Sequence, residues 1–182
     1  MNTLRVLRPT EPRPNEVTDA PRDLDDVYRR YCRYVASVCL RISGRRSELE
    51  DLVQEVFAEA ASTFDGLRDS DAVRGWLATI AVRVTRKRLY RRRLTALLGL
   101  PPATEYDRAA DPAASPYDRA LVAAIYRALD GLAPDDRIAF VLHHVEGETL
   151  EMVARLSRCS LTTAKRRIFR AKAALERRLG GG

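Results

Sequence analysis

The side chains with the most evident chemistry in this sequence are the cations near its C-terminal end. Residues 155–179 carry nine Lys/Arg against a single acidic residue, Glu176. Ser160 is of a type that caps the free N–H groups of a helix N-terminus. Apolar residues recur after it at steps of three and four: Leu161, Ala164, Ile168, Ala171 and Leu175. This spacing predicts a helix that starts at Ser160 and has one apolar face. The opposite face carries Thr163, Arg166, Arg167 and Arg170.

The chain from Gly147 up to this helix has the pattern of a short helix followed by a tight connection. Together the two helices have the shape of a helix-turn-helix, which packs its apolar face on a small core and inserts its polar face into a DNA major groove. An arginine there can clasp guanine through two acceptors, and each such pair discriminates between bases by on the order of 1–3 kcal/mol. The segment therefore predicts recognition of duplex DNA.

A second basic segment lies in the middle of the chain. Residues 83–93 hold seven Lys/Arg and no acid, whereas residues 95–154 hold four Arg against ten Asp/Glu. The net charge of +7 is thus divided between two basic segments with an acidic stretch between them. Because neutralisation of phosphates drives binding to nucleic acid, the two segments indicate two DNA contacts. A solvated helix face is the alternative for each basic run on its own.

An aromatic and polar break precedes the central basic segment. Residues 64–68 read as a break between helices, and a helix is expected from about Trp76 to Arg93. Its inner face would hold Trp76, Ile80, Val84 and Thr85, and its outer face Arg83, Arg86, Lys87 and Arg91. Such a loop beside a basic helix is suited to holding an unstacked base from an opened DNA strand. Taken singly, Phe64 and Trp76 are better explained as core residues.

The segment that begins at Leu49 has one apolar and one acidic face. The apolar face comprises Leu49, Leu52, Val53, Val56 and Ala60, and the outer face Asp51, Gln54, Glu55 and Glu59. Because an acidic surface repels DNA, this face fits a protein partner better. An ordinary solvated face is the alternative.

Proline and glycine divide the chain into two helical blocks. Residues 1–21 form a tail with several prolines, residues 22–98 a helical block without proline from Leu24 to Leu98, and residues 99–116 a linker of proline, alanine and acids. Residues 117–182 form the second block. The sequence therefore predicts an all-α protein of two small helical domains on a flexible linker, the second a four-helix domain with the helix-turn-helix.

Several classes of protein are disfavoured. No apolar run approaches the roughly 18 residues of a membrane span, and Met1 to Pro14 lacks the apolar region of a secretory signal. Three cysteines fit a reducing compartment, so a cytoplasmic protein is expected. The spacing of Cys32, Cys39 and the adjacent pair His143 and His144 does not suit a metal site. Without a phosphate loop or nucleophile elbow, neither cofactor nor catalysis is expected.

Three strings, in this order, carry a family resemblance: residues 51–57 (DLVQEVF), 74–81 (RGWLATIA) and 159–167 (CSLTTAKRR). Together they resemble the bacterial RNA polymerase sigma factors of the extracytoplasmic-function class, over nearly everything from Leu24 to Leu179. The resemblance implies that Asp51, Gln54 and Glu55 dock on the clamp helices of the polymerase largest subunit. It also implies a set that captures a flipped base of the −10 element and helps to open the duplex: Phe64, Asp65, Arg68, Trp76, Arg83 and Lys87.

The resemblance assigns the −35 element to the second domain. The residues implied are Arg158, Thr162, Thr163, Lys165, Arg166, Arg167 and Arg170. The acidic linker would thread toward the polymerase active-site cleft. Such proteins are commonly held inactive by an anti-sigma protein, and a linker of this length would also permit a compact free form with hidden DNA surfaces.

The chain departs from the family pattern at two positions. Family members often have glycine at Arg158, so a left-handed turn residue is expected to be missing there. They often have aspartate at Lys87, so this chain should bind upstream duplex more electrostatically. A two-domain helix-turn-helix regulator that binds duplex without the polymerase remains the alternative function. That alternative leaves the acidic face and the loop at Phe64 unexplained.

Overall fold

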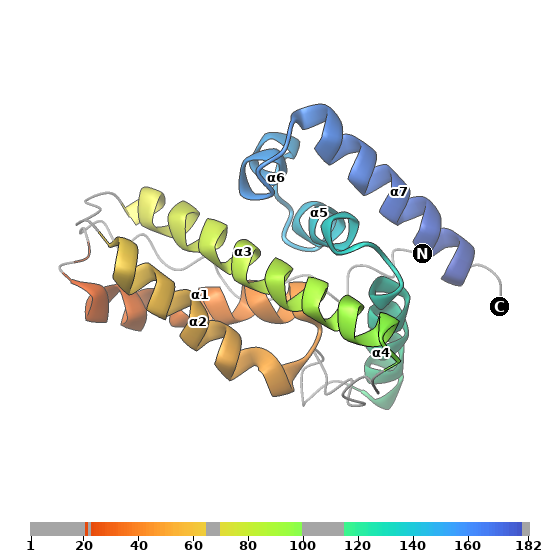
Figure 1. Ribbon diagram of the computed structural model, residues 1–182, viewed down its shortest axis with the longest axis horizontal. Helices are drawn as coiled ribbons and strands as arrows, with labels where there is room; N and C mark the ends of the chain where they lie inside the picture. The colour runs from red at the N-terminus through yellow and green to blue at the C-terminus, as the bar shows by residue number, and fades with distance from the viewer. Residues whose placement is uncertain (1–20, 22, 65–69, 100–114, 180–182) are drawn as a thin grey trace.

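A computed structural model describes residues 21, 23–64, 70–99 and 115–179, and nearly all of them lie in helices (Figure 1). The expected all-α fold is confirmed for this part of the chain. Figure 1 shows α1, α2 and α3 side by side in one part of the molecule and α5, α6 and α7 in another, with α4 at the end of α3. The two parts correspond to the two helical blocks.

The first block consists of α1 (Leu24–Ser43), a 3-10 helix (Arg46–Glu48), α2 (Leu49–Thr63) and α3 (Ser70–Leu97). Asp23 begins α1, because its side chain accepts a hydrogen bond from the Asp26 N–H at 2.8 Å. The three helices pack on one another through apolar residues spaced three or four apart. Among the fully buried side chains are Val27, Val35, Ile42, Leu52, Val56, Val73 and Leu77.

The second block consists of α4 (Pro116–Asp130), α5 (Pro134–His144), α6 (Leu150–Leu156) and α7 (Leu161–Leu179), so the expected four-helix domain is confirmed. Ser115 caps α4 and Pro116 opens it, as the residue types predict. Helix α7 packs mainly on α5 and α6. Of its expected apolar face, four residues are buried, but Leu161 in its first turn is 38% exposed because it lies beyond the edge of this small core.

The two blocks are packed against each other, with α5 contacting both α1 and α3. Arg137 of α5 is at the centre of this interface and its side chain is only 2% exposed. It donates from Nε to the Ile42 carbonyl at 2.7 Å and from Nη2 to the Ser43 carbonyl at 2.9 Å. These carbonyls end α1 and have no partner inside the helix. A residue of the second block therefore caps a helix of the first.

Two further contacts close the same interface. The Tyr126 hydroxyl donates to the Arg41 carbonyl at 3.2 Å, and the Arg41 guanidinium pairs with the Glu146 carboxylate at 2.8 Å. Gly44 follows α1 with φ of 71°, and a Cβ there would lie 2.4 Å from Cδ1 of Tyr126. Glycine is thus required both by the left-handed backbone and by the approach of the second block.

The packing of the two blocks is expected to weaken at alkaline pH because of Tyr126. Burial raises the pKa of Tyr126 from 10.0 to about 12. Because burial favours the neutral phenol, its contribution to the stability of the packed form is fully present below about pH 10. This contribution is lost as the pH rises toward about 12. We expect the radius of gyration, measured by small-angle X-ray scattering, to increase across this window. Tyr126→Phe has no proton to lose and should reduce the increase; an equal increase in this variant would exclude Tyr126 as its source.

Candidate nucleic-acid and protein interfaces

The turn between α6 and α7 has the geometry of a helix-turn-helix. The Arg158 N–H donates to the Arg155 carbonyl at 3.1 Å and the Cys159 N–H to the Ala154 carbonyl at 3.0 Å. At the end of a helix this pair of bonds places the donor of the first bond in the left-handed region, and Arg158 accordingly has φ of 49°. The expectation that a left-handed residue is missing here was wrong: the hydrogen-bond pattern holds an arginine where glycine is easier. Ser160 then caps α7 by accepting from the Thr163 N–H at 3.2 Å.

Arg158 has a strained left-handed backbone and an exposed side chain. We predict that this side chain contacts a DNA phosphate and that the contact offsets the strain. Replacing this exposed residue by glycine should relieve about 1–2 kcal/mol of strain while weakening duplex binding. We expect Arg158→Gly to melt at the same or a higher temperature than the wild type. The plot of the logarithm of the DNA association constant against the logarithm of salt concentration should become less steep by about 0.9, which corresponds to one phosphate contact. Arg158→Lys should keep the slope. A destabilised Arg158→Gly with an unchanged slope would make Arg158 a structural residue.

The outer face of α7 presents a group of exposed side chains near its start. Thr162, Lys165 and Arg166 are exposed, and within the described residues Lys165 and Arg166 have no acidic partner. Thr163 is half-buried, and its hydroxyl lies 2.9 Å from that of Ser160. These are the positions from which a recognition helix reaches base edges.

Phe169 is an exposed aromatic side chain on α7 that the sequence reasoning missed. Its side chain is 72% exposed, three residues after Arg166 on the polar side of the helix. An aromatic residue on the polar side was the signal that could have found it, since such a position is not part of a core.

Two of the expected DNA-binding arginines are already paired. Arg167 lies 2.6 Å from the Asp135 carboxylate and is 17% exposed, and Arg170 lies 2.6 Å from Asp136 and is 52% exposed. Both carboxylates come from the first turn of α5. In the free chain, carboxylates therefore occupy the sites on these arginines that a phosphate would take.

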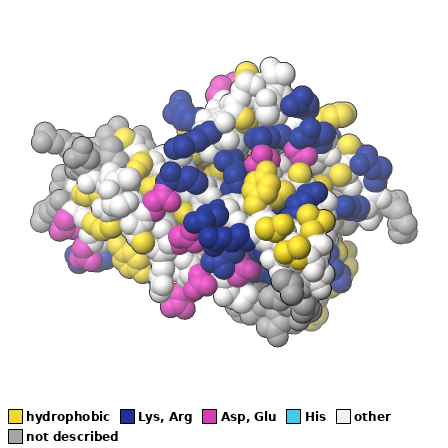
Figure 2. All heavy atoms as spheres, in the orientation of Figure 1, with side chains coloured by type: hydrophobic (Ala, Val, Ile, Leu, Met, Phe, Trp, Pro, Cys, Tyr) yellow, Lys and Arg dark blue, Asp and Glu magenta, His cyan; other side chains and the backbone are white. Residues whose placement is uncertain are grey.

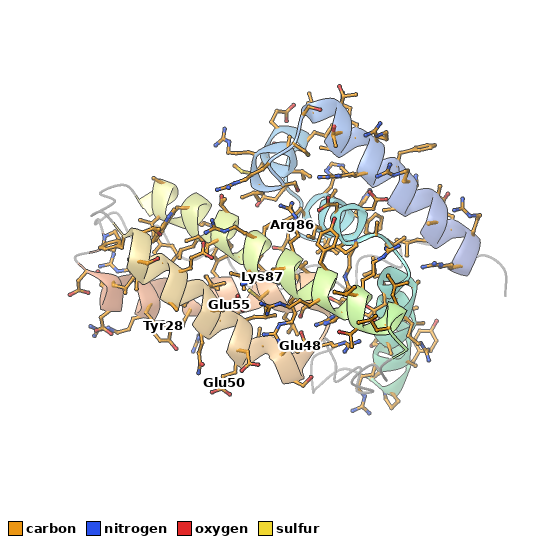
Figure 3. The ribbon with its side chains drawn as sticks, viewed as in Figure 1. Tyr28, Glu48, Glu50, Glu55, Arg86 and Lys87 are labelled. Carbon is orange, nitrogen blue, oxygen red and sulfur yellow. The ribbon has the colours of Figure 1, made fainter. Side chains whose placement is uncertain are left out.

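In the first block, the acidic face of α2 and the basic face of α3 lie side by side (Figure 3). Lys87 Nζ is 3.3 Å from Glu55 Oε1, Arg88 is 3.8 Å from Asp51, and Arg83 pairs with Glu59. Asp51 remains 68% exposed, and Gln54 is exposed beside it. The sequence reasoning treated these faces as separate, but the two helices cross so that acids partly neutralise bases.

The aromatic pair expected at the base-capturing loop is only half-exposed. Phe64 and Trp76 are both half-buried, with ring centroids 6.1 Å apart. Trp76 also lines a groove of about 640 Å³ together with Tyr34 and Arg74 of the first block and Met152 and Arg155 of the second. Asp65 and Arg68 lie outside the described residues. The rings thus pack on the edge of the core and keep part of their surface accessible.

Figure 2 shows where charge gathers on one face: Lys and Arg side chains cluster over α3 and α7, with acidic side chains among them. Within the described ranges, no three His, Cys, Asp or Glu side chains could jointly hold a metal ion. Each helix among the residues that the structure describes is too short or too polar to span a lipid bilayer.

Comparison with protein families gives two matches, in the order of the two blocks. The sigma-70 region 2 model matches residues 27–95, and the sigma-70, region 4 model matches residues 123–175. The first match contains α2 and most of α3, with the acidic and basic faces, and the second contains the helix-turn-helix.

Curated proteins are similar to this chain over most of its length. The ECF RNA polymerase sigma factor SigE of Mycolicibacterium smegmatis is 30% identical over 174 residues, which are 89% of this chain and 66% of that protein. The chain thus spans just under two thirds of that relative. The ECF RNA polymerase sigma-E factor of Escherichia coli K12 is 28% identical over 166 residues, 82% of this chain and 83% of that protein.

Solved structures share the fold. The sigma factor RpoE in complex with the anti-sigma factor NepR, from Bartonella quintana, superposes with a TM-score of 0.65 at 21% identity, over 87% of this chain and 98% of that one. CnrH in complex with the cytosolic domain of CnrY gives 0.56 at 25% identity, over 86% and 87%.

Proposed function

Because the chain belongs to the extracytoplasmic-function class of the sigma-70 family, we propose that it is an alternative sigma factor that binds core RNA polymerase, recognises the −35 and −10 promoter elements and promotes strand opening. The observation that carries the proposal is the order of the two matched regions. The first region contains the acidic face of α2 and the basic face of α3, which suit a protein partner and DNA. The second region contains the helix-turn-helix, which suits duplex DNA.

In this proposal the first block, residues 22–98, binds the polymerase and the −10 element. Asp51, Gln54 and Glu55 form the polymerase contact, supported by the high exposure of Asp51. The melting surface comprises Phe64, Asp65, Arg68, Trp76, Arg83 and Lys87. Half-exposed rings beside a row of cations suit a flipped base followed by its phosphates.

The second block, residues 117–182, reads the −35 element through α7 and the turn before it. The exposed set at the start of the helix would reach the bases: Thr162, Lys165 and Arg166. Arg158, Thr163, Arg167 and Arg170 would position the helix on the backbone, since most contacts to DNA from such positions go to phosphates. The acidic linker, residues 99–116, would enter the basic channel of the polymerase.

The same proposal places the protein in the cytoplasm, where the polymerase and the chromosome are. RNA synthesis is the chemistry of the polymerase, so this chain supplies binding free energy and no catalytic group or cofactor. A protein of the anti-sigma kind is its proposed inhibitor, because RpoE, which shares the fold, forms a complex with the anti-sigma factor NepR.

The test is reconstitution of the full chain with bacterial core polymerase and an abortive-transcription readout on promoter libraries. Chain-dependent initiation from promoters that share two elements is expected. Tight, site-specific duplex binding by the chain alone, without any effect on core polymerase, would instead establish a stand-alone regulator. The paired state of Arg167 and Arg170 argues against that alternative, since a stand-alone reader needs these arginines free.

A further inference from the structure

One carboxylate in α5 contacts both of the basic helices. Asp135 Oδ1 lies 3.0 Å from Nε of Arg86 on α3, and Oδ2 lies 2.6 Å from Nη2 of Arg167 on α7. The three side chains are between 17% and 23% exposed, so these ion pairs are partly shielded from water. Figure 3 shows Arg86 on the side of α3 that faces α5, while Lys87 faces the acidic α2.

Arg86 makes a second contact with the other block. Its Nη2 donates to the Ser157 carbonyl at 3.0 Å, in the turn immediately before the recognition helix. Arg86 of α3 is therefore held next to the start of α7. The contact joins the basic helix α3 to the turn that leads into α7.

We propose that Asp135, with Arg86 and Arg167, is an autoinhibitory latch. The carboxylate acts as an internal stand-in for a DNA phosphate, and it holds the strand-opening helix of the first block against the −35 helix of the second. This inference rests on the proposed function only in assigning α3 and α7 to a promoter. The contact between the two blocks stands without it.

Arg86 couples DNA binding to domain opening. A phosphate that takes Arg86 must displace Asp135 and the Ser157 carbonyl, which are the contacts of Arg86 with the second block. By linkage, an event that opens the blocks must raise the affinity of α3 for DNA to the same extent that DNA on Arg86 favours opening. Binding of core polymerase to the first block is the natural opening event.

The latch is one of several contacts in the interface, so its loss should loosen the closed form without unfolding it. Arg137 and the pair of Arg41 with Glu146 remain in place. For Asp135→Asn we expect the ratio of open to closed molecules to rise by roughly fivefold to thirtyfold.

The structure offers a matched control at the next residue. Asp136 lies in the same first turn of α5 and has the same charge, so Asp136→Asn changes the helix terminus to the same degree. It frees Arg170 of α7, and among the described residues the Asp136 side chain forms no ion pair or hydrogen bond with the first block. Asp136→Asn should therefore leave the distribution of domain distances unchanged.

The experiment is single-molecule energy transfer on the full chain, with dyes at Glu50→Cys in α2 and Glu176→Cys in α7. Cys32 and Cys159 are replaced by serine, while Cys39 is buried and stays. The latch predicts more open molecules in Asp135→Asn and in Arg86→Gln, and a double variant that is little more open than Arg86→Gln alone. It is overturned if Asp135→Asn is no more open than Asp136→Asn, or if the two single effects simply add.

A second readout separates the latch from the proposed function. Affinity of the free chain for −35 duplex should rise more in Asp135→Asn, which frees Arg167 and opens the blocks, than in Asp136→Asn, which frees Arg170 without opening them. If the wild-type chain fails to direct core polymerase while the distances shift as expected, the proposed function falls and the latch stands. If transcription works and the distances do not shift, the latch falls alone.

Discussion

Replacing Asp51 by arginine is expected to lower the affinity of the chain for core RNA polymerase by about a hundredfold, because like charges in a contact built for opposite ones cost several kcal/mol. The Asp51 side chain is 68% exposed, and Arg88, its partner in the chain, lies 3.8 Å away. It is therefore available to a cationic partner surface. Fluorescence anisotropy of the labelled chain, titrated with core polymerase, measures the affinity directly.

Glu176 on α7 is a close match for Asp51 as a control. Its side chain is 66% exposed and its cation, Lys172, lies 3.9 Å away. Glu176→Arg changes the net charge equally and should alter core affinity by no more than about twofold, as surface substitutions do. Equal losses in both variants would assign the effect to overall charge. An unchanged affinity in Asp51→Arg would remove α2 from the polymerase contact.

Removing the side chain of Arg166 is expected to reduce initiation by about 10-fold to 100-fold, with the loss confined to one base pair of the −35 element. Arg166 is exposed near the start of α7 and has no acidic partner in the described part of the chain. It is thus free to clasp a base without first breaking an ion pair. Abortive initiation from promoters carrying every single substitution in the −35 element measures both the loss and its position.

The neighbouring cations give contrasting controls for Arg166→Ala. Lys165→Ala should weaken all promoters about equally and reduce the salt dependence by one phosphate contact, because a lysine acts mainly as a point charge. Arg177 is exposed near the end of the same helix, and its removal should have little effect. A uniform loss in Arg166→Ala would place Arg166 on the backbone and leave base recognition to its neighbours.

The fold could be predicted because its determinants are local. Ser160 and Ser115 cap helices by bonding to backbone three residues on, and the spacing of Leu52, Val56 and Ala60 fixes which side of α2 is buried. Such signals act within one or two helical turns, so they can be recognised from residues that are close in sequence. The family resemblance from three strings is confirmed for the same reason, since each string lies within a single element or turn.

The pairing of the DNA-binding arginines with partners in the same chain could not be predicted, because the partners lie far away in sequence. Arg86 contacts Ser157 across 71 positions, and Arg167 contacts Asp135 across 32. Helical periodicity assigns each arginine to an outer face but cannot say that two outer faces meet. Arg158 shows the converse limit: residue preference favours glycine there, and the bonds that end α6 override it.

Arg137 determines how the two blocks can part. Its guanidinium is almost fully buried and bonded to two carbonyls at the end of α1 and to Asp130 in its own domain. A charge in such a position must regain water before it can leave, and a slightly widened interface would strip its partners without hydrating it. Separation should therefore be a single cooperative step with two discrete states. An intermediate average distance between the two blocks in solution would then arise from a mixture of closed and open molecules.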